Sequence, residues 1–178
     1  MNPSFPLERL GSIELLVLDV DGVLTDGLII VDGLGVESKH FHVKDGAAIA
    51  LWHKQGKKTA ILSGRSARCV DIRAAELGIH PVIQGASDKE EALRTLMLEL
   101  NLKPDQTTFM GDDLADLPAM ELAGFSACPS DGAAEVRGFA DFVTQARGGR
   151  GAVRELVEML LKAQGSWLKF SPTPGEIS

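Results

Sequence analysis

Short apolar runs that end abruptly in polar residues constrain the fold of this chain more than any other feature of its sequence. LLVLDV, TAILSG and TTFMGDD are almost continuously apolar up to Leu18, Leu62 and Met110, as strands buried on both faces should be. PVIQG and FSACP are two further β-rich runs, and helical patterns alternate with these runs along the chain. Such alternation indicates a parallel sheet covered by helices. We therefore predict an α/β fold with a Rossmann-like parallel sheet, in which the first three runs form central strands.

Helix start and stop signals lie between the strands. Segments 45–56 and 66–78 each run from a helix-start residue to a glycine. The next helix is expected to begin at Ser87, because Glu90 follows it in the spacing of a capping box and an apolar stripe comes after. The segment GAVRELVEMLLKA is also amphipathic. These patterns predict helices that pack on the sheet.

One stretch, LIIVDGLGVESKHFHV between Leu28 and Val43, breaks the alternation. It is typical of two strands around a Gly-rich turn. We predict a β-hairpin inserted directly after the first strand.

The length of 178 residues and the 44% apolar content suit a single domain with its own core. We place this domain at residues 13–164. Residues 1–12 are interpreted as an amino-terminal extension. Residues 165–178, which end in SPTPGEIS, are interpreted as a flexible tail.

The formal net charge of −7 argues against a nucleic-acid partner, because such binding relies on clustered Lys and Arg. A small-molecule substrate is expected instead. No apolar run has the length of a membrane span, and the first residues lack the pattern of a signal peptide. We expect a cytoplasmic protein with no membrane partner. Cys69 and Cys128 are far apart and are predicted to be unpaired thiols.

Polar clusters follow four of the predicted elements, at or near the carboxyl ends of strands, where ligands bind in open α/β sheets. They comprise Asp19 with Asp21, Ser63 with Gly64, Lys89, and Asp112 with Asp113 and Asp116. Carboxylates gathered in one place repel each other unless a cation or a proton is present. Oxygen ligands of this kind match Mg²⁺, which is the predicted cofactor.

The spacing of the first acidic pair indicates a division of roles. Asp19 is the candidate nucleophile, which would form an acyl phosphate. Asp21 would protonate the leaving group and later activate water. Lys89, the Ser63 hydroxyl and the Gly64 N–H would stabilise the phosphoryl oxygens. The sequence thus predicts phosphoester hydrolysis, although each motif taken alone also fits a turn, a helix cap or a solvated charge.

These motifs resemble those of the haloacid dehalogenase-like phosphatases. More narrowly, DVDGVLTDG, FHVKDG, LSGR, QGASDK, GDDLADLPAM and GGRGAVRE look like the 3-deoxy-D-manno-octulosonate 8-phosphate (KDO 8-phosphate) phosphatase family. The resemblance implies that Mg²⁺ is held by Asp19, Asp112 and the backbone carbonyl of Asp21, supported by Asp113 and Asp116. The substrate contacts that it implies are Asp21, His42, Val43, Lys44, Asp45, Gly46, Gly64, Arg65, Arg73 and Lys89.

The chain departs from the family pattern at Ala50, where family members commonly carry Arg, and this removes a contact to an acidic sugar. Ser63 stands where Thr is common and keeps the hydroxyl. Nonulosonate 9-phosphate is therefore a second candidate substrate. Outside this class, a signalling receiver with a phosphorylated Asp is the alternative, but its acidic pair and phosphorylated Asp occur in a different order along the chain. A catalytically silent module is disfavoured because every proposed catalytic group is present.

The intervals between motifs are too short for a cap domain. Because an open site would expose an aspartyl phosphate to water, we expect a neighbouring subunit to close it, and the resemblance implies a homotetramer. The GGRG segment with Arg147 and Arg150 is the candidate for reaching an adjacent site, or else a simple loop with solvated arginines. His40 and His42 share a strand face, but no third nitrogen or sulfur ligand is evident, so His42 is favoured as a pocket residue.

Overall fold

A computed structural model describes residues 7–167 of the chain. Its main sheet has six parallel strands in the order β5-β4-β1-β6-β7-β8. The strands are β1 (Leu15–Leu18), β4 (Lys58–Leu62), β5 (Val82–Ile83), β6 (Thr107–Met110), β7 (Phe125–Cys128) and β8 (Phe142–Val143). The three almost continuously apolar runs are β4, β1 and β6, which lie side by side in the interior of the sheet as predicted.

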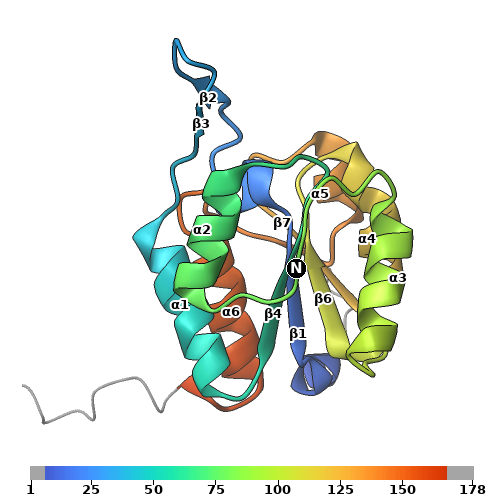
Figure 1. Ribbon diagram of the computed structural model, residues 1–178. Helices are drawn as coiled ribbons and strands as arrows, with labels where there is room; N and C mark the ends of the chain where they lie inside the picture. The colour runs from blue at the N-terminus through green and yellow to red at the C-terminus, as the bar shows by residue number, and fades with distance from the viewer. Residues whose placement is uncertain (1–6, 168–178) are drawn as a thin grey trace, which may run out of the picture.

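Helices cover both faces of the sheet (Figure 1). One layer contains α1 (Val43–Lys54), α2 (Arg68–Leu77) and α6 (Ala152–Ala163). The other contains α3 (Lys89–Glu99), α4 (Leu117–Leu122) and α5 (Ala134–Phe139). Short turns of other helix types complete the chain: η1 (Leu7–Ser12), η2 (Val20–Leu24), η3 (Pro104–Gln106) and η4 (Leu114–Asp116). The predicted α/β architecture is confirmed.

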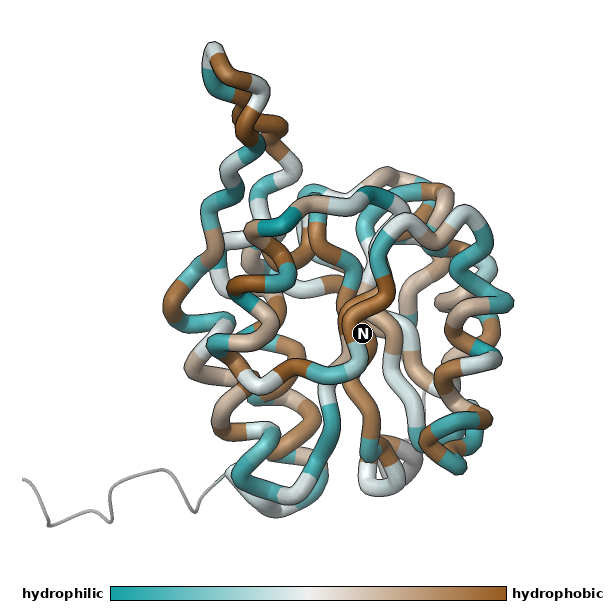
Figure 2. The backbone as a smooth tube through the Cα atoms, viewed as in Figure 1, coloured by the Kyte–Doolittle hydropathy of each residue, from teal (hydrophilic) through white to brown (hydrophobic). Residues whose placement is uncertain are grey.

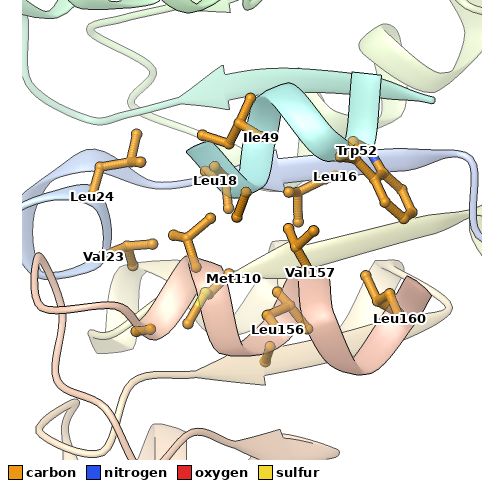
Figure 3. Packing of buried hydrophobic residues seen from close by; sticks show 14 of the residues in the cluster. Leu16, Leu18, Val23, Leu24, Ile49, Trp52, Met110, Leu156, Val157 and Leu160 are labelled. Atoms are coloured by element: carbon orange, nitrogen blue, oxygen red, sulfur yellow. The ribbon is translucent and has the colours of Figure 1, made fainter. Parts of the chain in front are cut away.

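Strand β1 divides the core into two halves because its side chains alternate between the two faces of the sheet. Leu16 and Leu18 join the cluster under α1 and α6, whereas Leu15 and Val17 join the cluster under α3 and α4. Figure 3 shows the first cluster, where side chains from β1, α1 and α6 interdigitate. Trp52 is fully buried there, and its indole N–H donates to the Lys58 carbonyl at 2.8 Å. The central strand is therefore covered on both faces.

The predicted hairpin is present but its ladder is short. Strands β2 (Ile30–Val31) and β3 (Glu37–Ser38) pair antiparallel. The hairpin projects beyond the carboxyl ends of the parallel strands (Figure 1), and Figure 2 shows apolar residues along it. Within residues 7–167 no further insertion forms a cap domain, and no helix of that range is long and apolar enough to cross a membrane.

Some predicted boundaries were wrong by one or two residues. Helix α1 begins at Val43 rather than Asp45, with His42 at its N-cap. Helix α3 is capped by Asp88 and not by Ser87, because the Asp88 carboxylate accepts a hydrogen bond from the Glu91 N–H at 3.0 Å. Ser87 and Asp88 both suit a cap, so spacing alone did not select between them, whereas His42 is not a residue type favoured at an N-cap and makes no side-chain cap hydrogen bond.

The ends of the predicted domain are partly described. Turn η1 precedes β1, and its Leu10 is fully buried. The Gln164 side-chain amide donates to the carbonyls of Leu10 and Ile13 at 2.9 and 3.0 Å, which joins the end of α6 to this turn. Most of the predicted tail lies outside the described residues. Both cysteines are free thiols, as expected.

Candidate active site

The acidic pair leaves the sheet through a compact turn. The Asp19 N–H still donates to the Met110 carbonyl at 3.0 Å, so Asp19 extends the ladder between β1 and β6. Turn η2 follows, and Gly22 within it has φ +85°. A Cβ atom at Gly22 would lie 2.0 Å from a carboxylate oxygen of Asp112. The glycine of DVDG therefore lets the turn approach the third acidic residue.

Residues from four strand ends line one open pocket. Ser63 follows β4 and is buried, Lys89 is the first residue of α3, and Asp112 and Asp113 follow β6. The pocket lining includes Asp19, Asp21, Ser63, Gly64, Arg65, Lys89, Asp112, Asp113 and Asp116. The fold thus gathers every residue predicted as catalytic, as a metal ligand or as a metal support.

Lys89 connects the nucleophile candidate to the acidic cluster. Its Nζ lies 3.2 Å from Asp19 Oδ1 and 2.5 Å from Asp116 Oδ1. The other oxygen of Asp116 accepts hydrogen bonds from the N–H groups of Asp112 and Asp113 at 3.0 and 3.2 Å. Asp116 is fully buried and fixed by these partners. This geometry suits a residue that supports the loop carrying Asp112.

The cluster carries more negative charge than its protein partners balance. Asp19, Asp112 and Asp116 each place a carboxylate oxygen within 4.8 Å of the others. Burial, followed by the charges of Asp19, Asp116 and Asp113, raises the pKa of Asp112 to about 8. Burial and Asp116 raise the pKa of Asp19 to about 6, although Lys89 opposes the shift. Hard oxygen donors with uncompensated charge fit a cation such as Mg²⁺.

Asp21 is held by residues that the sequence reasoning partly missed. Its Oδ1 accepts a hydrogen bond from Lys39 Nζ, and its Oδ2 lies 3.4 Å from Arg65 Nε. Arg65 was predicted as a substrate contact, but Lys39 was not singled out. Its signal was its position two residues after Glu37 in the predicted hairpin strand, a spacing that places both side chains on the same face. Burial opposes the charge on Lys39, yet the hydrogen bonds to Asp21 and Glu37 raise its pKa above the ordinary lysine value.

The predicted substrate contacts of helix α1 do not line the pocket around Asp19. His42, Asp45, Gly46 and Arg73 line a separate small hollow between α1 and α2. Arg73 pairs there with Glu76 at 2.8 Å. Val43 and Lys44 are exposed on the first turn of α1. Within one chain, the predicted substrate residues are therefore divided among the pocket, the hollow and the exposed first turn of α1.

Asp45 makes a structural contact to another helix. It is 1% exposed, and its two oxygens accept hydrogen bonds from the N–H groups of Gly151 at 3.1 Å and Arg154 at 2.8 Å. These donors belong to the start of α6, so Asp45 caps that helix from a distance. Burial raises the pKa of this carboxyl group.

The GGRG segment packs against its own chain. The Gly149 N–H donates to the Val23 carbonyl at 2.9 Å, and a Cβ atom at Gly148 would lie 1.7 Å from the Gly22 carbonyl oxygen. Arg150 pairs with Asp26 at 3.0 Å, and the side chain of Arg147 is exposed. The two glycines thus support the turn that carries Asp21.

Comparisons with known proteins agree with this fold. Residues 73–156 match the family described as haloacid dehalogenase-like hydrolase. The chain is 45% identical over 154 residues to the KDO 8-phosphate phosphatase KdsC of Escherichia coli strain K12, a match that covers 86% of this chain and 82% of the relative.

Two solved structures are also similar. KDO 8-phosphate phosphatase from Yersinia pestis has a TM-score of 0.89 at 40% identity and covers 91% of this chain and 88% of its own. The enzyme from Moraxella catarrhalis, in complex with magnesium ion, phosphate ion and KDO, has a TM-score of 0.90 at 41% identity. That match covers 92% of this chain and 94% of the Moraxella chain.

Proposed function

Since the chain belongs to the KDO 8-phosphate phosphatase family of haloacid dehalogenase-like hydrolases and is a phosphatase, we propose that it hydrolyses KDO 8-phosphate through an aspartyl phosphate on Asp19. The observation that carries the proposal is the pocket in which Asp19, Asp21 and Lys89 meet the acidic loop after β6. The names of the similar enzymes support the choice of sugar.

In the first step, a carboxylate oxygen of Asp19 attacks phosphorus, and the bond from phosphorus to the sugar oxygen breaks. Asp21 gives its proton to the departing alkoxide, which leaves as the free sugar. In the second step, Asp21 takes a proton from water, whose oxygen attacks phosphorus. Inorganic phosphate leaves, and Asp19 is regenerated.

Positive charge and N–H donors surround the position of the phosphoryl group. Lys89 lies between Asp19 and Asp116, and Ser63 and Gly64 line the same pocket. These groups stabilise charge on the phosphoryl oxygens without rearranging. Mg²⁺, when bound, would neutralise charge on the same oxygens. The carboxylates of Asp19 and Asp112 and the carbonyl of Asp21 would hold it, with Asp113 and Asp116 in support.

Phosphate release with Mg²⁺ tests this proposal. Asp19→Asn and Asp21→Asn are both expected to lose turnover of KDO 8-phosphate, measured beside the unaltered protein. Retained turnover in Asp19→Asn would remove Asp19 as the nucleophile. A long-lived phosphoprotein without phosphate release would instead support the receiver alternative.

The identity of the sugar depends on α1. Ala50 is exposed on that helix, one turn after Gly46, and its methyl group offers no polar contact to an acidic sugar. KDO 8-phosphate remains the proposed substrate on the strength of the relatives, and nonulosonate 9-phosphate remains the alternative. Turnover across a panel of both esters decides between them, and a higher kcat/KM for the nonulosonate ester would overturn the choice.

We also propose that the enzyme assembles as a homotetramer in which neighbouring subunits complete each site. The hairpin exposes large apolar side chains, namely Leu28, Ile29, Val31, Leu34 and Val36, and such surfaces mark contacts between proteins. The separation of Arg73 and the α1 residues from the pocket also favours this arrangement, because a second chain would supply the missing contacts.

A complementation assay tests the shared site. Asp19→Asn and Arg73→Ala subunits are each expected to be inactive or weak when purified alone. Mixed assemblies should regain activity, because an intact Asp19 of one chain can meet an intact Arg73 of another. Absence of recovery in mixtures that sediment as tetramers would contradict the proposal, as would a fully active monomer.

A further inference from the structure

The hairpin segment carries the charged residues Glu37 and Lys39 in addition to its exposed apolar side chains. Strand β3 ends next to Lys39, whose side chain is only 1% exposed. The stem of the hairpin stands over the carboxyl ends of the parallel strands (Figure 1). It therefore brings Lys39 to Asp21, although the two residues are 18 positions apart.

Asp21 is one of four charged side chains that form a closed ring. Lys39 Nζ bonds to Asp21 Oδ1 and lies 2.8 Å from Glu37 Oε1. The other oxygen of Glu37 accepts a hydrogen bond from Arg65 Nη2 at 2.9 Å, and Arg65 Nε lies 3.4 Å from Asp21 Oδ2. Positive and negative groups alternate around the ring, so each charge has two partners of opposite sign.

Burial makes the Lys39 side of this ring different from an ordinary surface ion pair. Surface pairs contribute little because water competes for them. The Lys39 side chain is 1% exposed and those of Asp21 and Glu37 are 19% and 20% exposed, whereas the Arg65 side chain is 51% exposed. A buried ammonium group is stable only if it is paired in good geometry, and this requirement restricts where the Asp21 carboxylate can lie.

We propose that Lys39 is a positioning residue, which holds the Asp21 carboxylate in the place from which it exchanges a proton with the leaving group. Glu37 orients Lys39 in turn. The inference rests on the proposed role of Asp21 as acid and base. It assigns the hairpin a catalytic purpose within its own subunit, in addition to any contact with a neighbouring one.

The test compares substrates whose leaving groups differ in their need for a proton. KDO 8-phosphate releases an alkoxide, which must be protonated, whereas p-nitrophenyl phosphate releases a stable phenolate. The measured quantity is kcat/KM, because it reports the steps up to the first irreversible one and excludes later hydrolysis of the aspartyl phosphate. Lys39→Met keeps most of the side-chain volume and removes the charge.

Lys39→Met is expected to lower kcat/KM for KDO 8-phosphate by about 10- to 100-fold, since positioned proton transfer contributes 10²- to 10⁴-fold. The loss with p-nitrophenyl phosphate should be less than about threefold, because the general-acid contribution is not needed there. Lys39→Arg should recover much of the lost activity. Lys54→Met removes an exposed lysine of α1 and should change neither value.

Equal losses with both substrates, or no loss, in Lys39→Met would overturn the inference. Asp21→Asn separates this failure from that of the proposed function. If Asp21→Asn loses activity selectively with KDO 8-phosphate and Lys39→Met does not, only the role of Lys39 fails. If Asp21→Asn shows no selectivity, the role of Asp21 fails and the inference fails with it.

Glu37→Gln provides a second variant in case Lys39→Met does not fold. It keeps Lys39 and removes one of the two carboxylates that hold it. A smaller loss, selective for KDO 8-phosphate, is expected. A loss of equal size with both substrates would count against the positioning role.

Discussion

Replacing Asp45 distinguishes a helix cap from a substrate contact. The carboxylate is 1% exposed and accepts hydrogen bonds from the N–H groups of Gly151 and Arg154. Loss of an N-cap costs about 1 kcal/mol, and each buried donor left without a partner costs about 1–3 kcal/mol. We expect Asp45→Ala to lower the free energy of unfolding by about 3 kcal/mol, since both donors lose their acceptor.

Asp45→Asn keeps one acceptor oxygen and should lose only about 1 kcal/mol. Urea unfolding measures both variants, with an unchanged slope as the sign that the transition itself is unaltered. In a thermal scan the Ala variant should melt about 6–12 °C lower. Lys44→Ala, at the exposed neighbouring position, should stay within about 0.5 kcal/mol of the unaltered protein.

The reasoning would be refuted by an Asp45→Ala protein of unchanged stability whose KM for the sugar phosphate rises. That result would mean that the carboxylate binds substrate, as the family resemblance implies, and that α6 does not depend on it.

Three other predictions concern the loop, the metal and the hairpin. Gly148→Ala should abolish activity or folding, because its Cβ would meet the Gly22 carbonyl oxygen at 1.7 Å. Gly138→Ala in α5 is the control: its Cβ would meet no atom within 4 Å, so this variant should be tolerated in the same thermal and activity assays. Apparent Mg²⁺ affinity should rise with pH up to about 8, because below that pKa the metal-free Asp112 carboxyl binds a proton that Mg²⁺ must displace. Calorimetry in buffers of different ionisation enthalpy should detect the released proton. An affinity independent of pH would contradict this prediction. Leu34→Asp, at a residue 90% exposed on the hairpin, should shift sedimentation toward smaller species, and an unchanged profile would count against hairpin-mediated assembly.

The central sheet was predictable because burial on both faces leaves a direct mark on composition. Strand β1 needs apolar residues at every position, and LLVL supplies them. Strand β8 was missed, since only Phe142 and Val143 form it at the edge of the sheet. Two residues give no periodicity to read, and β8 lacks flanking residues such as Pro81 and Gly85, which marked the equally short β5. Helix α5 was missed because its six residues are too few to show a helical stripe.

The pocket was predictable to the extent that the ends of parallel strands must converge. That rule places Asp19, Ser63 and Asp112 together without any knowledge of side-chain contacts. It says nothing about Lys39, because the path of an inserted hairpin depends on how its stem twists. Nor does it say that Asp45 faces α6, since helix packing sets that contact. Residues at strand ends were therefore found, and residues brought in by tertiary packing were not.

The contact of Gly148 and Gly149 with the turn after β1 also has a consequence for synthesis on the ribosome. A nascent chain that has emerged as far as β7 already contains all the strand-end motifs, but it lacks the backbone that supports the turn around Gly22. Because the chain leaves the ribosome from its amino terminus, the turn after β1 cannot gain this support until the segment just before α6 has emerged. The turn that carries Asp21 therefore gains this backbone support only after Gly148 and Gly149 have been synthesised.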